Sequence, residues 1–303
     1  MIAVATRRDV LLTAAGLLVP FAAGVARAQG RPDNTAIVAL AALESRSGGR
    51  LGVGLLDTGS GRIAGHRLDE RFAMCSTFKL ALAGLVLREA EQGRLRLDDA
   101  VAITKADLVS YAPVVEPKVG QTLTVAALAE AAQTTSDNAA ANLLLKRLGG
   151  PAGFTAALRA LGDTVTRLDR FETALNLVVP GDERDTTSPR AMADTLRRLL
   201  TGDALTAASR ERLIGWMVAT TTGAKRIRAG LPAAWRSGDK TGTAQADAMT
   251  DKVNDLAIAW PPGKAPIVIT AFFDSGRRTD ATQPGDEAVL AEVGRIAAAW
   301  ATA

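Results

Sequence analysis

Strand-like sequence is confined to the two ends of this chain, and that distribution constrains the fold more than any other feature. Near the start, residues 51–57 alternate in character and end at a Thr-Gly-Ser-Gly turn, after which residues 62–66 can return as a second strand. The strand-like pattern resumes only after Ala234, over residues 235–243, 255–260 and 266–273. Because short strands must pair to bury their apolar side chains, the two ends are expected to meet in one sheet.

The middle of the chain is predominantly helical. Apolar residues recur at helical spacing over residues 77–92, 123–133, 139–148, 153–161, 189–200 and 207–218, and helices are also predicted at the two ends over 34–44 and 287–300. Residues 170–188 differ, since they contain Pro180-Gly181 and many charges and therefore indicate a long ordered loop. Loops of this length inside a compact domain are usually functional.

This order of elements predicts an α/β (α+β) fold. An antiparallel sheet flanked by helices is built from both chain ends, residues 29–70 and 219–303. Residues 71–218, including the loop 170–188, form a central all-helical domain. A binding or active site is expected at the seam between the two parts.

The first 28 residues have the pattern of an export signal. Arg7-Arg8 precedes an apolar stretch, and Ala26-Arg27-Ala28 is a small-residue cleavage site, so maturation near Ala28 leaves Gln29 first. The alternative is an uncleaved membrane anchor, which is disfavoured because Pro20 interrupts a short stretch. No cysteine follows the signal, which excludes lipoprotein anchoring. The expected partner is the twin-arginine export machinery, and the expected location is periplasmic or secreted, with no stable membrane anchor.

Composition excludes several classes of function. Only 4% of the 303 residues are aromatic and the formal net charge is +4 without a long basic run, so we expect no nucleic-acid partner. Cys75 is the only cysteine and His66 the only histidine. An internal disulfide and a cysteine-based zinc site are therefore excluded, and no metal or cofactor is expected. A Ser-His-Asp triad would have to use His66.

A serine and a lysine three residues apart occur twice, and local geometry separates the two cases. Ser76 lies at the start of a predicted helix, where residues i and i+3 share a face, so Lys79 can reach the Ser76 hydroxyl. Ser237 and Lys240 lie on a predicted strand, where the same spacing points the side chains to opposite faces. Taken alone, Ser76 is better explained as a helix cap than as a nucleophile.

Two further short motifs carry candidate chemistry. Ser136-Asp137-Asn138 precedes a helix, and its simplest explanation is also a cap. Lys240-Thr241-Gly242-Thr243 lies on a strand that places both threonines on one face and Lys240 on the other, while Gly242 allows another chain to approach closely.

Together, and in this order, the Ser-Lys, Ser-Asp-Asn and Lys-Thr-Gly motifs are far more specific than any one of them. This set is typical of class A β-lactamases and penicillin-binding proteins. From about Asn34 to the C-terminus the chain closely resembles class A β-lactamases. The resemblance includes Arg170-Phe171-Glu172-Thr173-Ala174-Leu175-Asn176, which matches the start of that family's Ω-loop, here residues 170–188.

The resemblance implies hydrolysis of the β-lactam amide of penicillins and cephalosporins through an acyl-serine intermediate, giving antibiotic resistance. It implies a monomer with small-molecule substrates. The implied catalytic residues are Ser76 as nucleophile, Lys79 as its proton partner, Ser136 as proton relay, Glu172 as the base that activates water, and Lys240 as electrostatic support. The implied substrate-binding residues are Tyr111, Asn138, Asn176, Thr241, Gly242, Thr243 and Arg226. Arg170 and Asp185 match the ion pair that closes the Ω-loop, and the amides of Ser76 and Thr243 match the oxyanion hole.

Some alternatives stay open at this stage. Arg226 is either a partner for the substrate carboxylate or part of a solvated basic turn beside Lys225 and Arg228. Thr173-Ala174 replaces the Pro-Glu common in the family, and the segment 244–253 is longer than usual, which leaves substrate preference open. The competing functions are a D,D-peptidase, which lacks the Glu and Asn of the Ω-loop, and a β-lactam receptor that stays acylated, which is normally membrane-tethered.

Overall fold

The two ends of the chain form one antiparallel sheet, as expected. The computed structural model describes Met1 and residues 24–303, so most of the predicted signal peptide lies outside the described residues and stays a prediction. The sheet has five strands in the order β2-β1-β9-β8-β7. Their bounds are β1 Arg50–Asp57, β2 Ile63–His66, β7 Arg236–Ala246, β8 Met249–Trp260 and β9 Ile267–Asp274. The C-terminal strand β9 inserts between β1 and β8, which joins the two ends.

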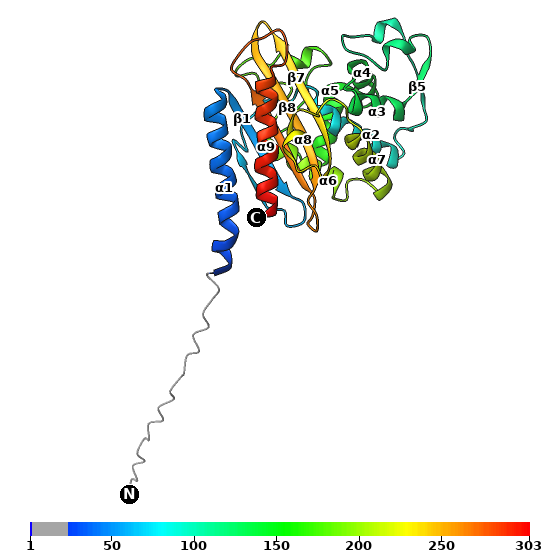
Figure 1. The fold of residues 1–303 in the computed structure, drawn as a ribbon. Coiled ribbons are helices and arrows are strands. Elements are labelled where there is room, and N and C mark those ends of the chain that lie inside the picture. The colour runs from blue at the N-terminus through cyan, green and yellow to red at the C-terminus, as the bar shows by residue number, and fades with distance from the viewer. Residues whose placement is uncertain (2–23) are drawn as a thin grey trace.

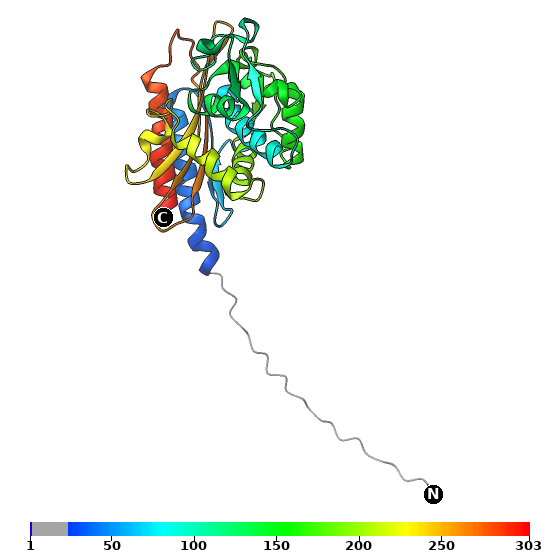
Figure 2. The same ribbon diagram turned by 90° about the vertical axis from the view of Figure 1, so that its right-hand side faces the viewer.

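Helices from both ends cover one face of this sheet. Figure 1 shows α1 (Gly24–Ser47) and α9 (Pro284–Thr302) lying side by side, and Figure 2 shows the same pair after a quarter turn about the vertical axis. Leu40 of α1 and Val293 of α9 are fully buried in the core they share with the sheet. The short helix α8 (Ile227–Gly230) packs directly on α9, where a Cβ at Gly294 would lie 2.2 Å from the Ile227 carbonyl oxygen.

The other face of the sheet is covered by the helical middle of the chain (Figure 2). Its helices are α2 Phe78–Glu91, α3 Val125–Thr134, α4 Asn138–Arg147, α5 Gly150–Ala160, α6 Pro189–Leu200 and α7 Ala207–Val218. The central helix α2 is buried on all sides from Phe78 to Leu87, including Lys79. The predicted limits of the two domains stay a prediction, because helices of the middle pack directly on the sheet, as α7 does on β7 and α6 on β9.

Side-chain caps explain where four of these helices begin. The backbone N–H of the third helical residue donates to an N-cap side chain at Thr124, Asp137, Ser188 and Thr206. The sequence prediction for α6 and α7 matches the structure at both ends. Helix α1 is longer than expected, and α8 was not predicted, because four residues are too few to show helical periodicity.

The middle of the chain also contains short strands and 3₁₀ turns that the sequence did not predict. Two-stranded ribbons pair β3 Phe72–Ala73 with β6 Thr186–Thr187, and β4 Ala100–Ala102 with β5 Thr122–Thr124. The 3₁₀ turns are η1 Cys75–Thr77, η2 Lys105–Asp107, η3 Glu116–Lys118 and η4 Ala174–Asn176. Strands of two or three residues are too short to show a two-residue alternation.

The segment 244–253 forms a hairpin. Strands β7 and β8 continue through it to a turn at residues 247–248, with a register shift between Ala244 and Ala246. The Ω-loop 170–188 is largely irregular, as predicted, and contains η4 and β6. Among residues 24–303, no helix combines the length and the apolar character that a membrane span requires.

Candidate active site

The predicted site residues converge on one cleft between β7, the turn η1 and the Ω-loop. Its volume is about 280 Å³. It is lined by Ser76, Tyr111, Ser136, Asn138, Asn176, Thr222, Arg226, Thr241 and Thr243. The close approach of η1 to β7 depends on Gly242, because a Cβ there would lie 2.8 Å from the Met74 carbonyl oxygen and 2.9 Å from the Thr77 methyl. The predicted role of this glycine in admitting another chain is confirmed.

Ser76 lies in the 3₁₀ turn immediately before α2. Cys75, which precedes it, has a φ of +48°, a left-handed conformation that is uncommon outside glycine. The Ser76 hydroxyl accepts a hydrogen bond from Lys79 Nζ at 3.0 Å and donates to Glu172 Oε1 at 3.3 Å. The contact that the spacing of Ser76 and Lys79 predicted is therefore present. The adjacent helix N-terminus also favours negative charge that develops near this hydroxyl.

Lys79 is fully buried and surrounded by oxygen atoms. Besides Ser76, its Nζ donates to the Ser136 carbonyl oxygen at 2.9 Å and to Asn138 Oδ1, and it lies 3.0 Å from Glu172 Oε1. Burial lowers the pKa of Lys79 by disfavouring the ammonium, although the negative charge of Glu172 opposes this effect. An amine with a lowered pKa gives up its proton more readily than an exposed lysine, which suits a proton carrier.

Glu172 is held by amide side chains from two directions. Its backbone N–H donates to Asn142 Oδ1, and its carbonyl oxygen accepts from Asn142 Nδ2, both at 2.8 Å. Its Oε2 accepts from Asn176 Nδ2 at 2.7 Å. Asn176 Oδ1 is buried and has no protein partner among the described residues, which leaves it free to accept a hydrogen bond from a water molecule.

Ser136 links the two buried lysines. Lys240 Nζ donates to the Ser136 hydroxyl at 3.0 Å, and Lys79 Nζ lies 3.5 Å from the same oxygen. The pKa of Lys240 falls well below its usual value, chiefly through burial and also through the charge of Lys79. Ser136 has a φ of +62°, so its backbone also adopts a left-handed conformation.

The cap interpretation holds for Asp137, the middle residue of the Ser-Asp-Asn motif. Its Oδ1 accepts from the Ala140 N–H at 2.8 Å, and its Oδ2 accepts from the N–H groups of Val114 and Val115 at 2.9 Å. The two flanking residues, Ser136 and Asn138, line the cleft. The motif therefore combines a structural cap with two side chains that face the site.

Tyr111 and Asn138 lie together at the mouth of the cleft. Tyr111 is 60% exposed, has a φ of +62°, and accepts the Asn138 N–H at its carbonyl oxygen at 3.0 Å. Asn138 Nδ2 donates to the Ser110 carbonyl oxygen at 2.8 Å, so this side chain fixes the strained loop while its Oδ1 contacts Lys79. An exposed aromatic ring at this rim can pack against an entering ligand.

Hydroxyl groups line the strand side of the cleft. Thr241 Oγ1 is 2.7 Å from Thr222 Oγ1, a contact that the sequence analysis missed because Thr222 lies in a turn without a motif. Arg226 is only 5% exposed, which overturns the alternative that it belongs to a solvated basic turn. Its guanidinium donates to the carbonyl oxygens of Gly242 and Asn254 at 3.0 and 2.8 Å, and to Thr243 Oγ1 at 2.7 Å. Arg226 therefore orients Thr243 and the strand.

The Ω-loop is closed by a buried ion pair. Arg170 Nε contacts Asp185 Oδ2 at 2.5 Å, and Asp185 Oδ1 accepts the backbone N–H groups of Asp169 and Arg170 at 2.7 and 3.0 Å. The predicted pairing of Arg170 with Asp185 is present.

Cys75 is free and buried, in a small cluster with Val178 and Ala244, and burial raises the pKa of its thiol to about 12. Cys75 is therefore a small packed side chain.

His66 takes no part in the cleft. Its ring nitrogen lies 2.9 Å from Glu44 Oε2, where β2 meets α1. A Ser-His-Asp triad is therefore absent. Among the described residues, no group of histidine, cysteine and carboxylate side chains is arranged to hold a metal ion.

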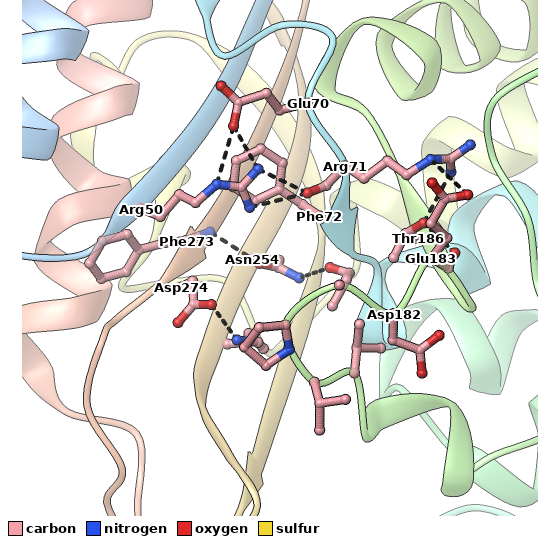
Figure 3. A pocket seen from close by; sticks show the side chains of 16 residues that line it. Arg50, Glu70, Arg71, Phe72, Asp182, Glu183, Thr186, Asn254, Phe273 and Asp274 are labelled. Atoms are coloured by element: carbon pink, nitrogen blue, oxygen red, sulfur yellow. Dashed lines mark hydrogen bonds and ion pairs between the residues drawn. The ribbon is translucent and has the colours of Figure 1, made fainter.

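A second and larger pocket, of about 560 Å³, also involves the Ω-loop. We call it the back pocket; it is lined by Arg50, Glu70, Arg71, Phe72, Ala73, residues 178–183, Thr186, Lys252, Asn254, Phe273 and Asp274. Figure 3 shows Arg50 directed at Glu70 across the ring of Phe72. None of the predicted catalytic residues lines this pocket, so the smaller cleft is the candidate active site.

Comparisons with known proteins agree with this geometry. Residues 35–301 match a family model described as the β-lactamase enzyme family. β-Lactamase AST-1 of Nocardia asteroides is 54% identical over 84% of this chain and 80% of its own length. The carbapenem-hydrolysing β-lactamase KPC of Klebsiella oxytoca is 46% identical over 85% of this chain and 86% of its own. The solved structure of an ancestral class A β-lactamase is 57% identical, with a TM-score of 0.82 over 86% of this chain and 98% of that one.

Proposed function

Because this chain belongs to the β-lactamase enzyme family and hydrolyses β-lactams as class A enzymes do, we propose that Ser76 is the residue that the substrate acylates. The observation that carries this assignment is the contact of the Ser76 hydroxyl with both Lys79 and Glu172. A serine hydroxyl is a weak nucleophile until an adjacent base removes its proton. Here two candidate bases lie within hydrogen-bonding reach of one oxygen.

In the acylation step, Ser76 Oγ attacks the lactam carbonyl carbon and its proton passes to the neighbouring base. The C–N bond of the ring then breaks, and the leaving nitrogen takes up a proton. We assign that delivery to Ser136, whose hydroxyl lies between the two lysines at 3.5 Å from Lys79 and 3.0 Å from Lys240. The backbone N–H groups of Ser76 and Thr243 are proposed to hold the oxyanion.

In the deacylation step, a water molecule attacks the ester that links the substrate to Ser76. Glu172 is the proposed base, and the unpartnered Oδ1 of Asn176 is proposed to orient that water. The water gives its proton to Glu172 and its oxygen bonds to the acyl carbon; the bond from that carbon to the Ser76 oxygen then breaks, and Glu172 returns the proton to Ser76. The Asn142 side chain keeps Glu172 in place through both of its amide atoms.

We further propose that hydroxyl groups bind the substrate carboxylate. The hydroxyl groups of Ser136, Thr241 and Thr243 all line the cleft. Two buried cations lie next to them, since Lys240 donates to Ser136 and Arg226 donates to Thr243. Arg226, which also lines the cleft, donates to Thr243 Oγ1, and its other hydrogen bonds go to the backbone carbonyl oxygens of Gly242 and Asn254. Its positive charge still reaches the cleft through that hydroxyl, because hydrogen bonds to charged groups polarise their neighbours.

A purified-protein assay separates this function from its two competitors. With a chromogenic cephalosporin, the enzyme is expected to turn over many equivalents of substrate. A burst of one equivalent followed by a stable acyl-protein would instead indicate a receptor. Release of D-alanine from cell-wall peptides, without β-lactam turnover, would indicate a D,D-peptidase. The Glu172–Asn176 contact favours the β-lactamase, because a receptor that stays acylated needs no base on the water side and a D,D-peptidase lacks the Glu and Asn of this loop.

We propose that the chain is exported by the twin-arginine machinery and cleaved after Ala28. The support is Arg7-Arg8 before an apolar stretch and Ala26-Arg27-Ala28 as a cleavage site. Replacement of Arg7 and Arg8 by lysine is expected to retain the precursor inside the cell. Normal periplasmic activity of that variant, measured on fractionated cells, would contradict the proposal.

A further inference from the structure

Two aspartates are buried behind the substrate-binding strand, and no motif in the sequence identified them. Asp239 on β7 and Asp255 on β8 are both 0% exposed. In the register of the two strands, Asp255 lies opposite Thr241, and Asp239 lies opposite Ala257. The two carboxyl groups therefore occupy diagonal positions on one face of the sheet, where side chains are close enough to interact.

The cations around this pair are too few for two carboxylates. Arg228 of α8 forms an ion pair with Asp239 Oδ1, whereas Arg226 contacts backbone carbonyl oxygens, Thr243 and Glu287 of α9. Lys240 is adjacent in sequence to Asp239, but its Nζ points to Ser136 on the other face. Within the part of the chain that the structure describes, Asp255 accepts one hydrogen bond, from the backbone N–H of Ile227 to Oδ2 at 3.1 Å.

Each aspartate also has one oxygen without a partner. Asp239 Oδ2 and Asp255 Oδ1 are buried and accept no hydrogen bond from any described residue. The Asp239 oxygen occupies a niche formed by Gly223, where a Cβ would lie only 1.2 Å from it. Two carboxylate oxygens cannot satisfy each other, since both are acceptors, but a proton on one of them supplies the missing donor.

We propose that Asp239 and Asp255 share one proton, with Asp255 as a neutral carboxylic acid and Asp239 as the carboxylate, and that this acid pair is a positioning element for Lys240. The positioning role rests on the function proposed above for Lys240. The acid pair belongs to a set of contacts that attach β7 to the helical part of the molecule. Gln133 of α3 donates to the Asp239 carbonyl oxygen at 2.9 Å, and Arg228 also reaches the Thr220 carbonyl oxygen at 3.4 Å.

The pKa directions agree with this assignment. Burial raises the pKa of Asp255 well above its usual value, and the negative charge of Asp239 adds to the rise. Burial also raises the pKa of Asp239, against the opposing charges of Arg228 and Lys240. A second negative charge in this space would repel the first and push β7 away from β8, which would loosen the contact between Lys240 and Ser136.

The sign of the pH effect follows from linkage. A carboxyl group whose pKa is higher in the folded chain than in the unfolded chain stabilises the fold at low pH. That contribution is lost as the pH rises through the folded-state pKa. Asparagine at position 255 imitates the neutral acid, because its amide donates to Asp239 and its oxygen still accepts from Ile227. Asp255→Asn should therefore remove this loss of stability at alkaline pH.

The test compares Asp255→Asn with Asp239→Asn, and uses Asp251→Asn as a matched control on the same strand β8. Thermal unfolding is followed from acidic to alkaline pH, together with steady-state kinetics on a penicillin. Asp255→Asn is expected to keep kcat/KM within about threefold of wild type and to gain stability relative to wild type as the pH rises. Asp239→Asn removes the negative charge that Arg228 pairs with and should lower kcat by roughly tenfold, with a shifted pH profile.

A direct readout of the proton is the infrared carbonyl band of a protonated carboxylic acid. It is expected in the wild-type protein at neutral pH, absent from Asp255→Asn, and present in Asp251→Asn. If that band is missing from the wild type, or if Asp255→Asn destabilises the protein equally at every pH, the shared proton is wrong. A wild-type protein that shows the band but no β-lactam turnover would defeat the proposed function while leaving the acid pair intact. An unchanged kcat and pH profile in Asp239→Asn would remove the positioning role.

Discussion

The active-site cleft and the back pocket both use the Ω-loop, yet they differ in how they treat charge. Asn176 of the loop lines the cleft, and residues 178–183 line the back pocket. In the cleft, Lys79 and Lys240 are 0% exposed. In the back pocket, the side chains of Arg50 and Glu70 are 40% and 46% exposed and neutralise each other in solvent. The Arg50–Glu70 pair therefore costs little desolvation, whereas the two lysines at the cleft keep their positions against the cost of burial.

Backbone conformation separates the same two regions. Around the cleft, Cys75, Tyr111 and Ser136 all have φ values between +48° and +62°, a backbone conformation that residues other than glycine rarely adopt. Among the residues that line the back pocket, only Gly181 has a positive φ, and glycine adopts it without strain. Each strained residue costs about 1–3 kcal/mol and persists only where its surroundings enforce it. Volume is therefore a poor guide to the reactive site here, and enforced geometry is a better one.

The largest expected effect is that of Ser76→Ala. It removes the proposed nucleophile, so kcat should fall by on the order of 10⁶-fold and no covalent adduct should form with a penicillin. The matched control is Ser237→Ala, which changes the serine of the second Ser-x-x-Lys sequence on β7. Intact mass and steady-state kinetics check both variants. An adduct on Ser76→Ala, or equal losses in the two variants, would place the nucleophile elsewhere.

The next effect compares two glutamates of the Ω-loop. Glu172→Ala should slow deacylation by about 10²–10⁴-fold, because general-base catalysis of water attack is lost. The acyl-enzyme should then accumulate and be visible by intact mass. The control, Glu183→Ala, removes a side chain that is 62% exposed and lines the back pocket, and it should turn over penicillins at the wild-type rate. Normal turnover by Glu172→Ala would return the peptidase and receptor to contention.

Within the cleft, the positions of Ser76 and Glu172 differ in how far the sequence predicts them. The contact of Ser76 with Lys79 follows from local helix geometry, so the spacing was sufficient. The position of Glu172 came only from the family resemblance, because the amide contacts that hold it, from Asn142, join residues thirty positions apart. No local pattern encodes such a contact between a helix and an irregular loop.

Two features escaped prediction and a third, the environment of Arg226, stayed open, each for a distinct physical reason. Asp239 and Asp255 lie within strands, where a charged residue normally indicates the face of the sheet that is exposed to solvent. Here both faces of the sheet are covered, so both carboxyl groups are buried. Arg226 had two open interpretations, because the burial of its side chain depends on the packing of α8 against α9 at Gly294. That contact joins segments far apart in the sequence. The hairpin over residues 244–253 was missed because polar residues there mask the alternation of two strands that pair with each other.

Arg226→Ala should have an intermediate effect. It removes a charged donor from Thr243 and the hydrogen bonds that the guanidinium gives to the carbonyl oxygens of Gly242 and Asn254. Hydrogen bonds to charged groups contribute about 1.5–3 kcal/mol, so KM for substrates with a ring carboxylate should rise by roughly tenfold or more, with some loss of stability. Lys225→Ala, an exposed neighbour, is the control. An unchanged KM for both penicillins and cephalosporins would show that Arg226 only supports the strand.

The smallest expected effect is that of Arg50→Gln in the back pocket, and it tests whether that pocket is as independent of catalysis as its charges suggest. Arg50 donates to Glu70 and to the Arg71 carbonyl oxygen, and its guanidinium lies 3.9 Å from the centre of the Phe72 ring. Because the ion pair is largely solvated, its loss together with the ring contact should cost about 1 kcal/mol. Chemical denaturation should show this change, while kcat and KM stay at wild-type values.

Phe72 belongs to β3, which pairs with β6 at the end of the Ω-loop, so a path to Glu172 exists in the fold. A fall in the deacylation rate of Arg50→Gln would mean that this path carries strain from the back pocket to the cleft, and the contrast between the two regions would then be one of degree.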